Sequence, residues 1–239
     1  MIETKIQGFV VNKVVYKEND AIFNVLCADQ MYTFKARGIL KITSKNAPAC
    51  NYCLQGEYVL ASKLENNKYN LKTASIIKMY HVPYDNLQAM SVYLTITEIA
   101  YKVYETNNIY KLCIECFDKL ERNEAPLNVL VYFLKELINI LGYQPDLSGC
   151  INCHKKQNLI SFSLEEGGFI CSNCFDSNKH IKYSNDYLKS ILKLYKEDDY
   201  LSIIDTRVNK MVINYLTFLK NEVGIYLKNE NILMTSMEA

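Results

Sequence analysis

The sequence contains no tryptophan, only 4 prolines and only 8 glycines among its 239 residues. Collagen-like and disordered chains are much richer in proline and glycine, so this composition excludes both classes. No apolar run reaches the roughly 18 to 20 residues that a membrane span requires, and run 127–141 is interrupted by Asn128, Lys135, Glu136 and Asn139. With 49% hydrophobic residues, the chain can instead build a sizeable core, in one large domain or two to three small ones.

Targeting and catalytic motifs are also missing. Segment 1–5 has no basic stretch leading into an apolar run, so we expect no secretion signal and a chain that stays in the reducing cytoplasm. Phosphate-binding loops, zinc-protease motifs and nucleophile elbows are absent from the sequence, and His81, His154 and His180 stand in no nucleophile or metal-ligand motif. An enzyme is therefore the weaker interpretation.

The net charge is close to zero, at +1 from 27 basic and 26 acidic residues, which by itself argues against strong nucleic-acid binding. The balance is uneven along the chain. Residues 1–80 hold 11 basic and 6 acidic side chains, a balance of +5, whereas residues 81–239 hold 16 and 20, a balance of −4. A polyanion would be attracted to the first part and proteins to the second, although +5 is also common on an ordinary solvated surface.

Between Lys5 and Tyr80, β-branched and aromatic residues alternate with polar ones and are divided by turn-like polar clusters. This pattern predicts about five strands, with a tight turn at 65–67 and a long connection at 38–56. Such an arrangement fits an OB-fold barrel, which commonly holds oligonucleotides or oligosaccharides, although other small barrels would give a similar pattern. The strands are expected at 5–16, 20–28, 31–37, 57–65 and 68–79.

After His81 the apolar period changes to about 3.6, which predicts helices. We therefore predict an α+β protein with two domains. Residues 1–80 would form a five-stranded nucleic-acid-binding OB-fold barrel, and residues 81–239 an all-helical domain interrupted by a Cys-rich insert at 143–182. The helices are expected at 85–105, 108–121, 126–141, 184–196 and 205–227.

Two C-x2-C pairs, Cys150/Cys153 and Cys171/Cys174, are separated by seventeen residues. This spacing lets two knuckles place four thiolates tetrahedrally around one Zn²⁺. A hairpin between the pairs, with its turn at 167–168, would bring them together. Four thiolates leave no position for water, so we expect one structural zinc ion and no catalysis there.

Two further C-x2-C pairs, Cys50/Cys53 and Cys113/Cys116, have the spacing for a second shared zinc or a dithiol redox site. Cys113 and Cys116 occupy apolar positions of an expected helix, where a free cysteine behaves as a small buried hydrophobe. Cys50 and Cys53 precede a strand without the βαβ context of a thioredoxin-like motif. Buried thiols are therefore the favoured interpretation for these four and for Cys27, and a second zinc stays open as the alternative.

Basic residues gather at the first expected hairpin and where the third strand enters the long connection. Such side chains can follow phosphates, while nearby Tyr16, Tyr32 and Phe34 could offer faces to bases. With 19 tyrosines and no tryptophan in the chain, a single tyrosine more often packs than binds a base. Arg37, the one arginine beside ten lysines in residues 1–80, is favoured for bidentate phosphate contact. The candidate DNA-binding residues are Lys13, Lys17, Lys35, Arg37, Lys41 and Lys45.

These features together resemble the bacterial recombination mediator RecO family over nearly the whole chain. The resemblance lies at residues 3–11, 20–22 and 36–38 and in a closing helix at 224–228. Its most specific part combines the sequence LGYQPDL, residues 141–147, with the two cysteine pairs, Phe162-Ser163 and Glu166-Gly167-Gly168. His154 stands where the family often has a glycine after the second cysteine.

The resemblance implies an OB-fold, a helical domain and a zinc-binding insert that act without catalytic turnover in the bacterial cytoplasm, at the nucleoid. Family members bind single- and double-stranded DNA, anneal complementary strands and, with the partner RecR, help load RecA onto DNA coated by single-stranded-DNA-binding protein. The DNA-binding role is carried over to Lys35, Arg37, Lys41 and Lys45. Loop 39–46 holds fewer basic residues than the family usually has, so we expect weak, salt-sensitive binding and more reliance on partners.

Three roles would follow from the resemblance. The basic barrel edge would hold one strand, an apolar groove in the helical part would accept the tail of single-stranded-DNA-binding protein, and the zinc insert would brace the helices. Two alternatives stay open. One is a protein-only adaptor with a structural zinc site, consistent with the −4 balance of residues 81–239; the other is a thiol- or zinc-dependent enzyme.

Overall fold

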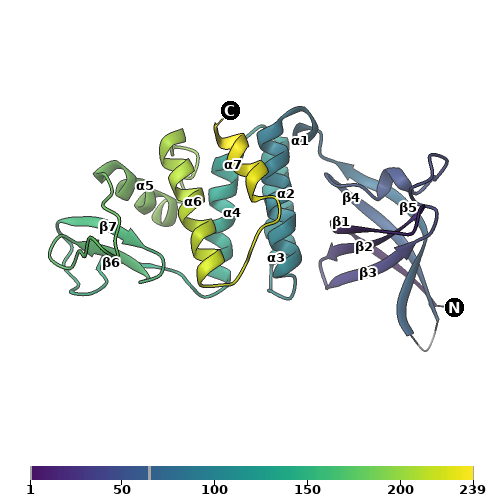
Figure 1. Cartoon of the computed structure of the whole chain (residues 1–239), viewed down its shortest axis with the longest axis horizontal. Coiled ribbons are helices and arrows are strands. Elements are labelled where there is room, and N and C mark those ends of the chain that lie inside the picture. The colour runs from purple at the N-terminus through teal and green to yellow at the C-terminus, as the bar shows by residue number, and fades with distance from the viewer. Residues whose placement is uncertain (1, 64–65, 239) are drawn as a thin grey trace. The chain divides into compact units, whose positions relative to one another are not determined.

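The alternating apolar residues near the amino terminus form five strands that close into a barrel (Figure 1). The computed structural model describes residues 2–63 and 66–238, so Glu65 of the expected turn at 65–67 lies outside the described residues. The order around the barrel is β1-β2-β3-β5-β4, and a short parallel pairing of Phe34 and Lys35 with Tyr69 and Asn70 closes it. This five-stranded barrel is like that of an OB-fold. The strands are β1 (Ile2–Tyr16), β2 (Asp20–Cys27), β3 (Met31–Ala36), β4 (Leu54–Lys63) and β5 (Asn66–Met79).

The barrel interior is packed with aromatic and aliphatic side chains. Phe34 stacks on Phe23, with ring centroids 5.7 Å apart, and its ring lies 5.5 Å from that of Tyr58. Tyr58 donates its hydroxyl to the carbonyl of Ala49 at 3.0 Å, so its one polar group is satisfied inside the core. Tyr32 is also buried. Tyr32 and Phe34 therefore belong to the core and offer no face to a base.

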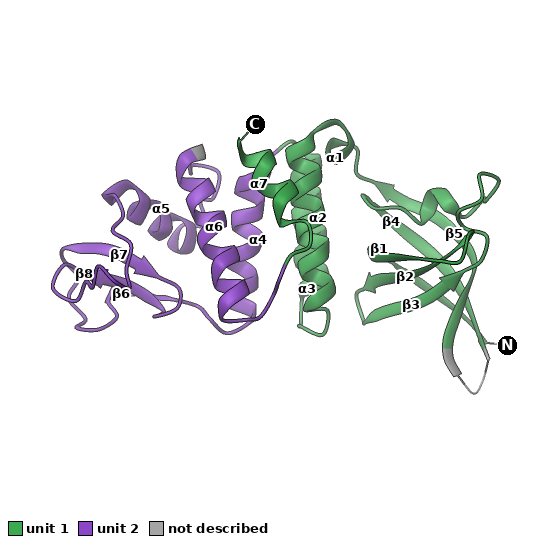
Figure 2. Ribbon diagram, in the orientation of Figure 1, with its two compact units in different colours: residues 1–123, 227–239 green, residues 124–226 purple. Residues whose placement is uncertain are grey.

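Helices that follow the barrel pack against it within the same compact unit, residues 1–123 and 227–239 (Figure 2). Phe117 is the centre of this packing. Its ring lies 5.1 Å from that of Phe9 on β1, 5.6 Å from that of Tyr80 and 4.2 Å from that of Tyr93. The helices of this unit are α1 (Val82–Asp85), α2 (Leu87–Lys102), α3 (Ile109–Glu121) and α7 (Glu230–Glu238), and a 3-10 turn, η1 (Ala47–Ala49), lies in the connection after β3.

The second compact unit, residues 124–226, contains three helices and a small sheet. Asn128 donates its side-chain amide to the carbonyls of Tyr200 and Ile203, and buried Lys135 pairs with Asp198 at 2.7 Å. These contacts fix the connection between α5 and α6 onto α4, because a buried polar group needs its partner to remain satisfied. The elements are α4 (Pro126–Ile140), β6 (Asp146–Cys150), β7 (Leu159–Ser163), β8 (Gly168–Cys171), α5 (Asn185–Lys196) and α6 (Asp205–Asn221).

The α+β organisation is confirmed: an OB-like barrel is followed by helices and by an insert that carries four cysteines. The prediction of one helix at 205–227 was wrong. α6 ends at Asn221, Gly224 adopts a left-handed backbone (φ +75°), and α7 then returns to the first unit. The segment 224–228, expected in a closing helix, lies in that connection. Among the described helices, none is both long and apolar enough to cross a membrane.

Candidate metal centre and nucleic-acid interface

The four cysteines of the expected zinc site lie on the small sheet of the second unit, whose strand order is β6-β8-β7. Cys150 ends β6 and Cys171 ends β8, and these two strands are parallel, so both cysteines reach the same end of the sheet. Cys153 and Cys174 follow in tight turns. The N–H of His154 donates to the carbonyl of Cys150 at 2.8 Å, and the N–H of Cys174 donates to that of Cys171 at 3.1 Å. The topology thereby brings the two knuckles together.

The close approach of β6 and β8 depends on a glycine. A Cβ on Gly168 would lie only 2.4 Å from the carbonyl oxygen of Asp146, so no larger residue fits without a shift of one strand. The expected hairpin turn contains Gly167, at φ +81°, whereas Gly168 already belongs to β8. The glycine pair thus serves two purposes, a left-handed turn and a close strand contact.

The sulfur positions fit a metal ion with four thiolate ligands. All four Sγ atoms lie within 4.8 Å of one another, and those of Cys153 and Cys171 are 3.6 Å apart. A tetrahedral site with Zn–S bonds of about 2.3 Å has sulfur–sulfur edges of about 3.8 Å. Such a site would be closed to water, and a metal there would stabilise the fold.

The electrostatics of the cluster also suit a cation. Burial raises the pKa of the Cys150 thiol, but backbone N–H groups of Cys171 and Cys153 donate to its sulfur, and its pKa falls to about 6. The pKa of Cys171 is lowered in the same way, against the effect of burial. The hydrogen bond to the sulfur of Cys153 raises the pKa of Cys174 to about 12. Four adjacent sulfurs cannot all carry negative charge without a compensating cation.

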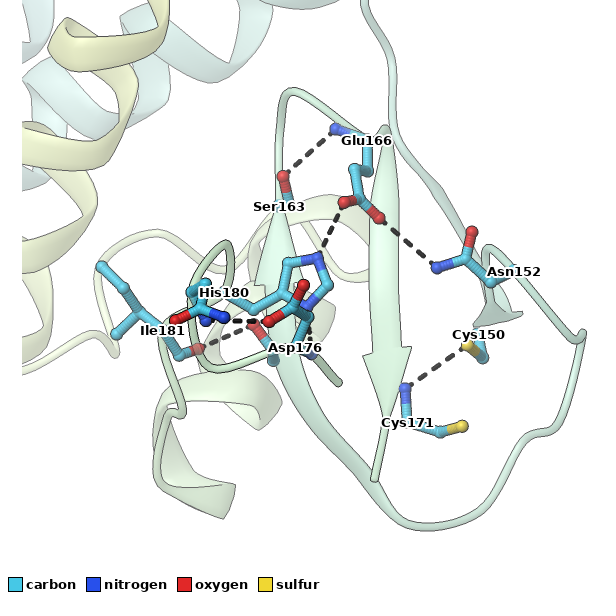
Figure 3. Close-up of polar contacts among 10 residues, drawn as sticks. Cys150, Asn152, Ser163, Glu166, Cys171, Asp176, His180 and Ile181 are labelled. Carbon is cyan, nitrogen blue, oxygen red and sulfur yellow. Dashed lines mark hydrogen bonds and ion pairs between the residues drawn. The ribbon is translucent and has the colours of Figure 1, made fainter. Parts of the chain in front are cut away.

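A polar network joins the first knuckle and the segment after the second knuckle to the hairpin turn (Figure 3). Glu166 lies 2.7 Å from Nε2 of His180 and 3.4 Å from the side-chain amide of Asn152. The backbone N–H of Asp176 donates to Nδ1 of His180 at 2.9 Å, so the ring proton belongs on Nε2 and points to Glu166. That hydrogen bond is the largest cause of a lowered pKa at Glu166. Sequence reasoning did not predict this network, because Asn152 and His180 are 28 residues apart and come together only in the fold.

His154 departs from the family pattern but fits its position. Its backbone is left-handed, with φ 59°, and its side chain is exposed. This conformation is the one that glycine adopts most readily. Here the knuckle tolerates a side chain because that side chain points to solvent.

The other cysteines are dispersed. Within the described residues, Cys50/Cys53 and Cys113/Cys116 do not come together as a metal-ligand group, so the second zinc finds no support. Burial raises the pKa of Cys50 and of Cys53 to about 12, and the pKa of Cys113 further still. Such thiols stay protonated at neutral pH and are poor nucleophiles. Their burial, and that of Cys27, agrees with the expected structural role.

Only some of the candidate DNA-binding residues lie together. Lys17, Arg37 and Lys41 line one hollow of about 540 Å³ on the barrel, formed by the β1–β2 turn and the start of the connection after β3. Lys13 and Lys45 do not line it. The Nζ of Lys13 lies 5.7 Å from the ring centroid of Phe23, and Lys45 is exposed further along the connection.

Lys35 does not line this hollow but pairs with Asp20, an acidic residue that does and that sequence reasoning did not identify. Asp20 pairs with Nζ of Lys35 at 3.1 Å and accepts the backbone N–H of Gly38 at 2.9 Å. The hydrogen bond from Gly38 and then the Lys35 pair hold the pKa of Asp20 below its usual value. Lys35 also lies over the ring of Tyr16, 4.4 Å from its centroid. Asp20 therefore orders the hollow and, with Glu18, places negative charge in it.

Comparisons with known proteins agree with these observations. Residues 1–80 match the family "Recombination protein O N terminal" and residues 84–213 match "Recombination protein O C terminal". The "DNA repair protein RecO" of Dehalococcoides mccartyi (strain BAV1) is 27% identical over 219 residues, covering 89% of this chain and 85% of that protein. The protein of that name in Mesoplasma florum is 25% identical, with 95% and 88% covered. The one in Bacillus cereus (strain AH187) is 20% identical, with 96% of each covered. The chain thus belongs to the RecO family of DNA repair proteins.

Proposed function

We propose that this chain is a non-catalytic recombination mediator that binds single- and double-stranded DNA through its barrel. The observation that carries the proposal is the hollow lined by Lys17, Arg37 and Lys41. These three cations lie on loops of an OB-like barrel, where basic side chains can follow a phosphate backbone. Residues 1–80 would be the nucleic-acid-binding domain, and Lys13, Lys35 and Lys45 would extend the contact.

A surface of this kind would hold one strand by its phosphates and leave the bases free to pair. Phosphate contacts fix a strand without reading its sequence, which is what annealing of arbitrary complementary strands requires. The few cations make binding weak and salt-dependent, because each phosphate contact releases about 0.9 counterion from duplex DNA and about 0.7 from a single strand. Partners would compensate for that weakness.

By its resemblance to the family, this chain would have RecR and single-stranded-DNA-binding protein as partners. Together they would help load RecA onto the DNA. The tail of single-stranded-DNA-binding protein would dock in an apolar groove of the helical part. The work would take place in the bacterial cytoplasm, at the nucleoid. These steps need no covalent chemistry.

The zinc ion would be structural. Cys150, Cys153, Cys171 and Cys174 would hold one Zn²⁺, which supplies the positive charge that four adjacent thiolates need. The hydrogen bonds of Glu166 with His180 and Asn152 would keep the knuckles in place around it. The insert would in this way brace the helices of its unit.

The test is fluorescence anisotropy of labelled single-stranded DNA across a salt series, with the double variant Arg37→Ala/Lys41→Ala. We expect the affinity to fall about tenfold or more at low salt and the logarithmic salt slope to flatten by about 1.4, because two phosphate contacts are lost. The control is Lys182→Ala/Lys189→Ala, which removes two exposed cations from the second unit. Equal binding by both double variants, or strand annealing unaffected by the first, would contradict the proposal.

A protein-only adaptor is the second candidate, favoured by the −4 balance of residues 81–239. It predicts no salt-dependent DNA binding by the intact protein at low salt while partner binding persists. A thiol-dependent enzyme has less support, because Cys50 and Cys53 are buried and carry raised pKa values. Any thiol–disulfide activity that requires these two residues would revive it.

A further inference from the structure

One large apolar side chain stands fully in solvent beside the basic hollow. Ile42 is 105% exposed, whereas the other exposed large hydrophobic side chains of the described chain range from 37% to 64%. It lies between Lys41 and Lys45, which are both exposed. Isolated apolar side chains on a surface are ordinary, but complete exposure between two cations is not explained by packing.

The backbone presents Ile42 at the apex of an ordered turn. The N–H of Ser44 donates to the carbonyl of Lys41 at 2.9 Å, which makes Ile42 and Thr43 the central residues of a β-turn. On the amino-terminal side, Ile39 is buried in the barrel core. The turn is therefore fixed to the barrel at its start.

The other side of the turn is fixed as well. The side-chain amide of Asn46 donates to the carbonyl of Lys72 at 3.1 Å and accepts the N–H of Ala74 at 3.1 Å. Asn46 thus pairs with the edge of β5 as a short strand would, and η1 begins at the next residue. An apolar tip held from both ends keeps its position when a ligand meets it.

We propose that Ile42 is a wedge that inserts between neighbouring bases of a DNA strand held by Lys41 and Lys45. Apolar side chains such as isoleucine are used in this way by proteins that unstack base steps, where phosphate contacts nearby hold the backbone. Lys41 belongs both to this turn and to the hollow with Lys17 and Arg37, so a strand followed by these cations passes the tip. Unstacked bases are open to pairing with a complementary strand.

The charge around the tip favours a nucleic acid over a partner protein as the occupant. Cations precede and follow Ile42, and Lys17 and Arg37 line the hollow beside it together with Lys41. Of the two acidic residues of that hollow, Glu18 and Asp20, Asp20 is paired with Lys35 from outside it. A polyanion satisfies these cations and offers stacked apolar base faces at the same place. The inference rests on the proposed DNA-binding function, and its test separates the two.

The test uses the full-length protein and a single-stranded oligonucleotide with 2-aminopurine between adenines, whose fluorescence rises when the base is unstacked. Anisotropy on the same strand reports binding. We expect saturating wild-type protein to raise the fluorescence about twofold or more, and Ile42→Ser to abolish the rise. The affinity of Ile42→Ser should fall less than about fivefold and its salt slope should stay unchanged, because phosphate contacts remain.

Two further variants serve as controls. Ile42→Leu keeps an aliphatic tip and should keep the rise, and Ile77→Ser makes the same chemical change at another exposed position of the barrel and should also keep it. A wild-type complex that binds without a rise in fluorescence, or an Ile42→Ser complex with an unchanged rise, overturns the wedge alone. Absence of any anisotropy change overturns the proposed function together with it. If Ile42→Ser loses only the binding of purified single-stranded-DNA-binding protein, the tip is a protein contact and the wedge is wrong.

Discussion

The barrel and the cysteine-containing sheet are stabilised in different ways. The barrel has a continuous core in which Phe23, Phe34 and Tyr58 interlock, whereas the small sheet has short strands of four to five residues and gathers four sulfurs at one end. Apolar burial of about 25 cal/mol per Å² can sustain the first. The second is much smaller, and in the proposed function a metal ion held by its cysteines adds the stability that so small a core does not supply.

This difference determines where substitutions are tolerated: on the barrel turns but not at the cysteine cluster. Basic residues on the barrel turns can be exchanged without disturbing a core that lies beneath them. A cysteine of the proposed zinc site would have no such freedom, because its four ligands would act together. Substitutions on the barrel turns should therefore alter DNA binding, and substitutions at the cysteine cluster should alter folding.

The largest effect is expected from Cys171→Ser. Loss of one thiolate should reduce zinc, measured by atomic emission, from about one ion per chain to well below that ratio. Because structural zinc binding contributes to folding, the second unit should lose more than about 3 kcal/mol in free energy of unfolding. Anisotropy should show DNA binding by the barrel within about threefold of wild type, since the barrel core does not involve this unit.

The matched control is Cys113→Ala, which removes a thiol buried in α3. Its zinc content should not change, and its free energy of unfolding should fall by only about 1 kcal/mol, the loss usual for a small change in a core. Stoichiometric zinc in Cys171→Ser, or zinc loss in Cys113→Ala, would contradict the prediction that Cys171 holds zinc and Cys113 does not. Chelation of zinc from the wild type should reproduce the Cys171→Ser unfolding profile.

An intermediate effect is expected from Asp20→Asn in the barrel. The variant removes a negative charge from the hollow and frees Lys35, while the amide oxygen can still accept the N–H of Gly38. One unit charge at about 4 Å is worth about 1 kcal/mol in water, so DNA affinity at low salt should rise about fivefold. The gain should fade at high salt as the charges are screened.

Stability should change little in Asp20→Asn, because the ion pair is near the surface and screened by solvent. The pKa of Asp20 is lowered on folding. The difference in stability from wild type should therefore be constant above the unfolded aspartate pKa of about 3.9 and shrink as the pH falls below it. The control is Asp199→Asn in the second unit, whose carboxylate also accepts a backbone N–H; it should leave DNA affinity unchanged. A gain in affinity for both variants would point to a general charge effect.

Sequence reasoning predicted the strands and most helices but not the contacts between them. Period-2 alternation located all five barrel strands to within three residues at their described ends, and cysteine spacing indicated a cluster that the fold does assemble. Both are local patterns. The end of α6 was missed because the apolar period continues past it. The sequence signal was Gly224, whose left-handed backbone lets the N–H of Ile225 donate to the carbonyl of Leu219 at 2.9 Å and so ends the helix.

The polar contacts lay beyond such reasoning for a physical reason. Asp20 meets Lys35 across two paired strands, and Glu166 meets His180 through a fold-dependent turn, so neither pair has a fixed spacing that a sequence can display. For Ile42 the sequence indicates the location but not the exposure of the side chain. Its neighbours in sequence mark it as part of a basic loop, yet its complete exposure depends on how Asn46 and Ile39 fix the turn.

The smallest effect is expected from His154→Gly, which tests the knuckle without touching a ligand. His154 holds φ 59° with an exposed side chain, so glycine removes a conformational strain of about 1 kcal/mol and loses no packing. Greater freedom in the unfolded chain offsets part of this gain. The melting temperature should rise by at most about 2–4 °C, and zinc release to a chelator should be slower. His154→Val should move both measurements in the opposite direction, because a β-branched residue is disfavoured at positive φ. If glycine destabilises the site, the imidazole of His154 supports the metal directly, and the cysteine sheet depends on more than its four thiolates.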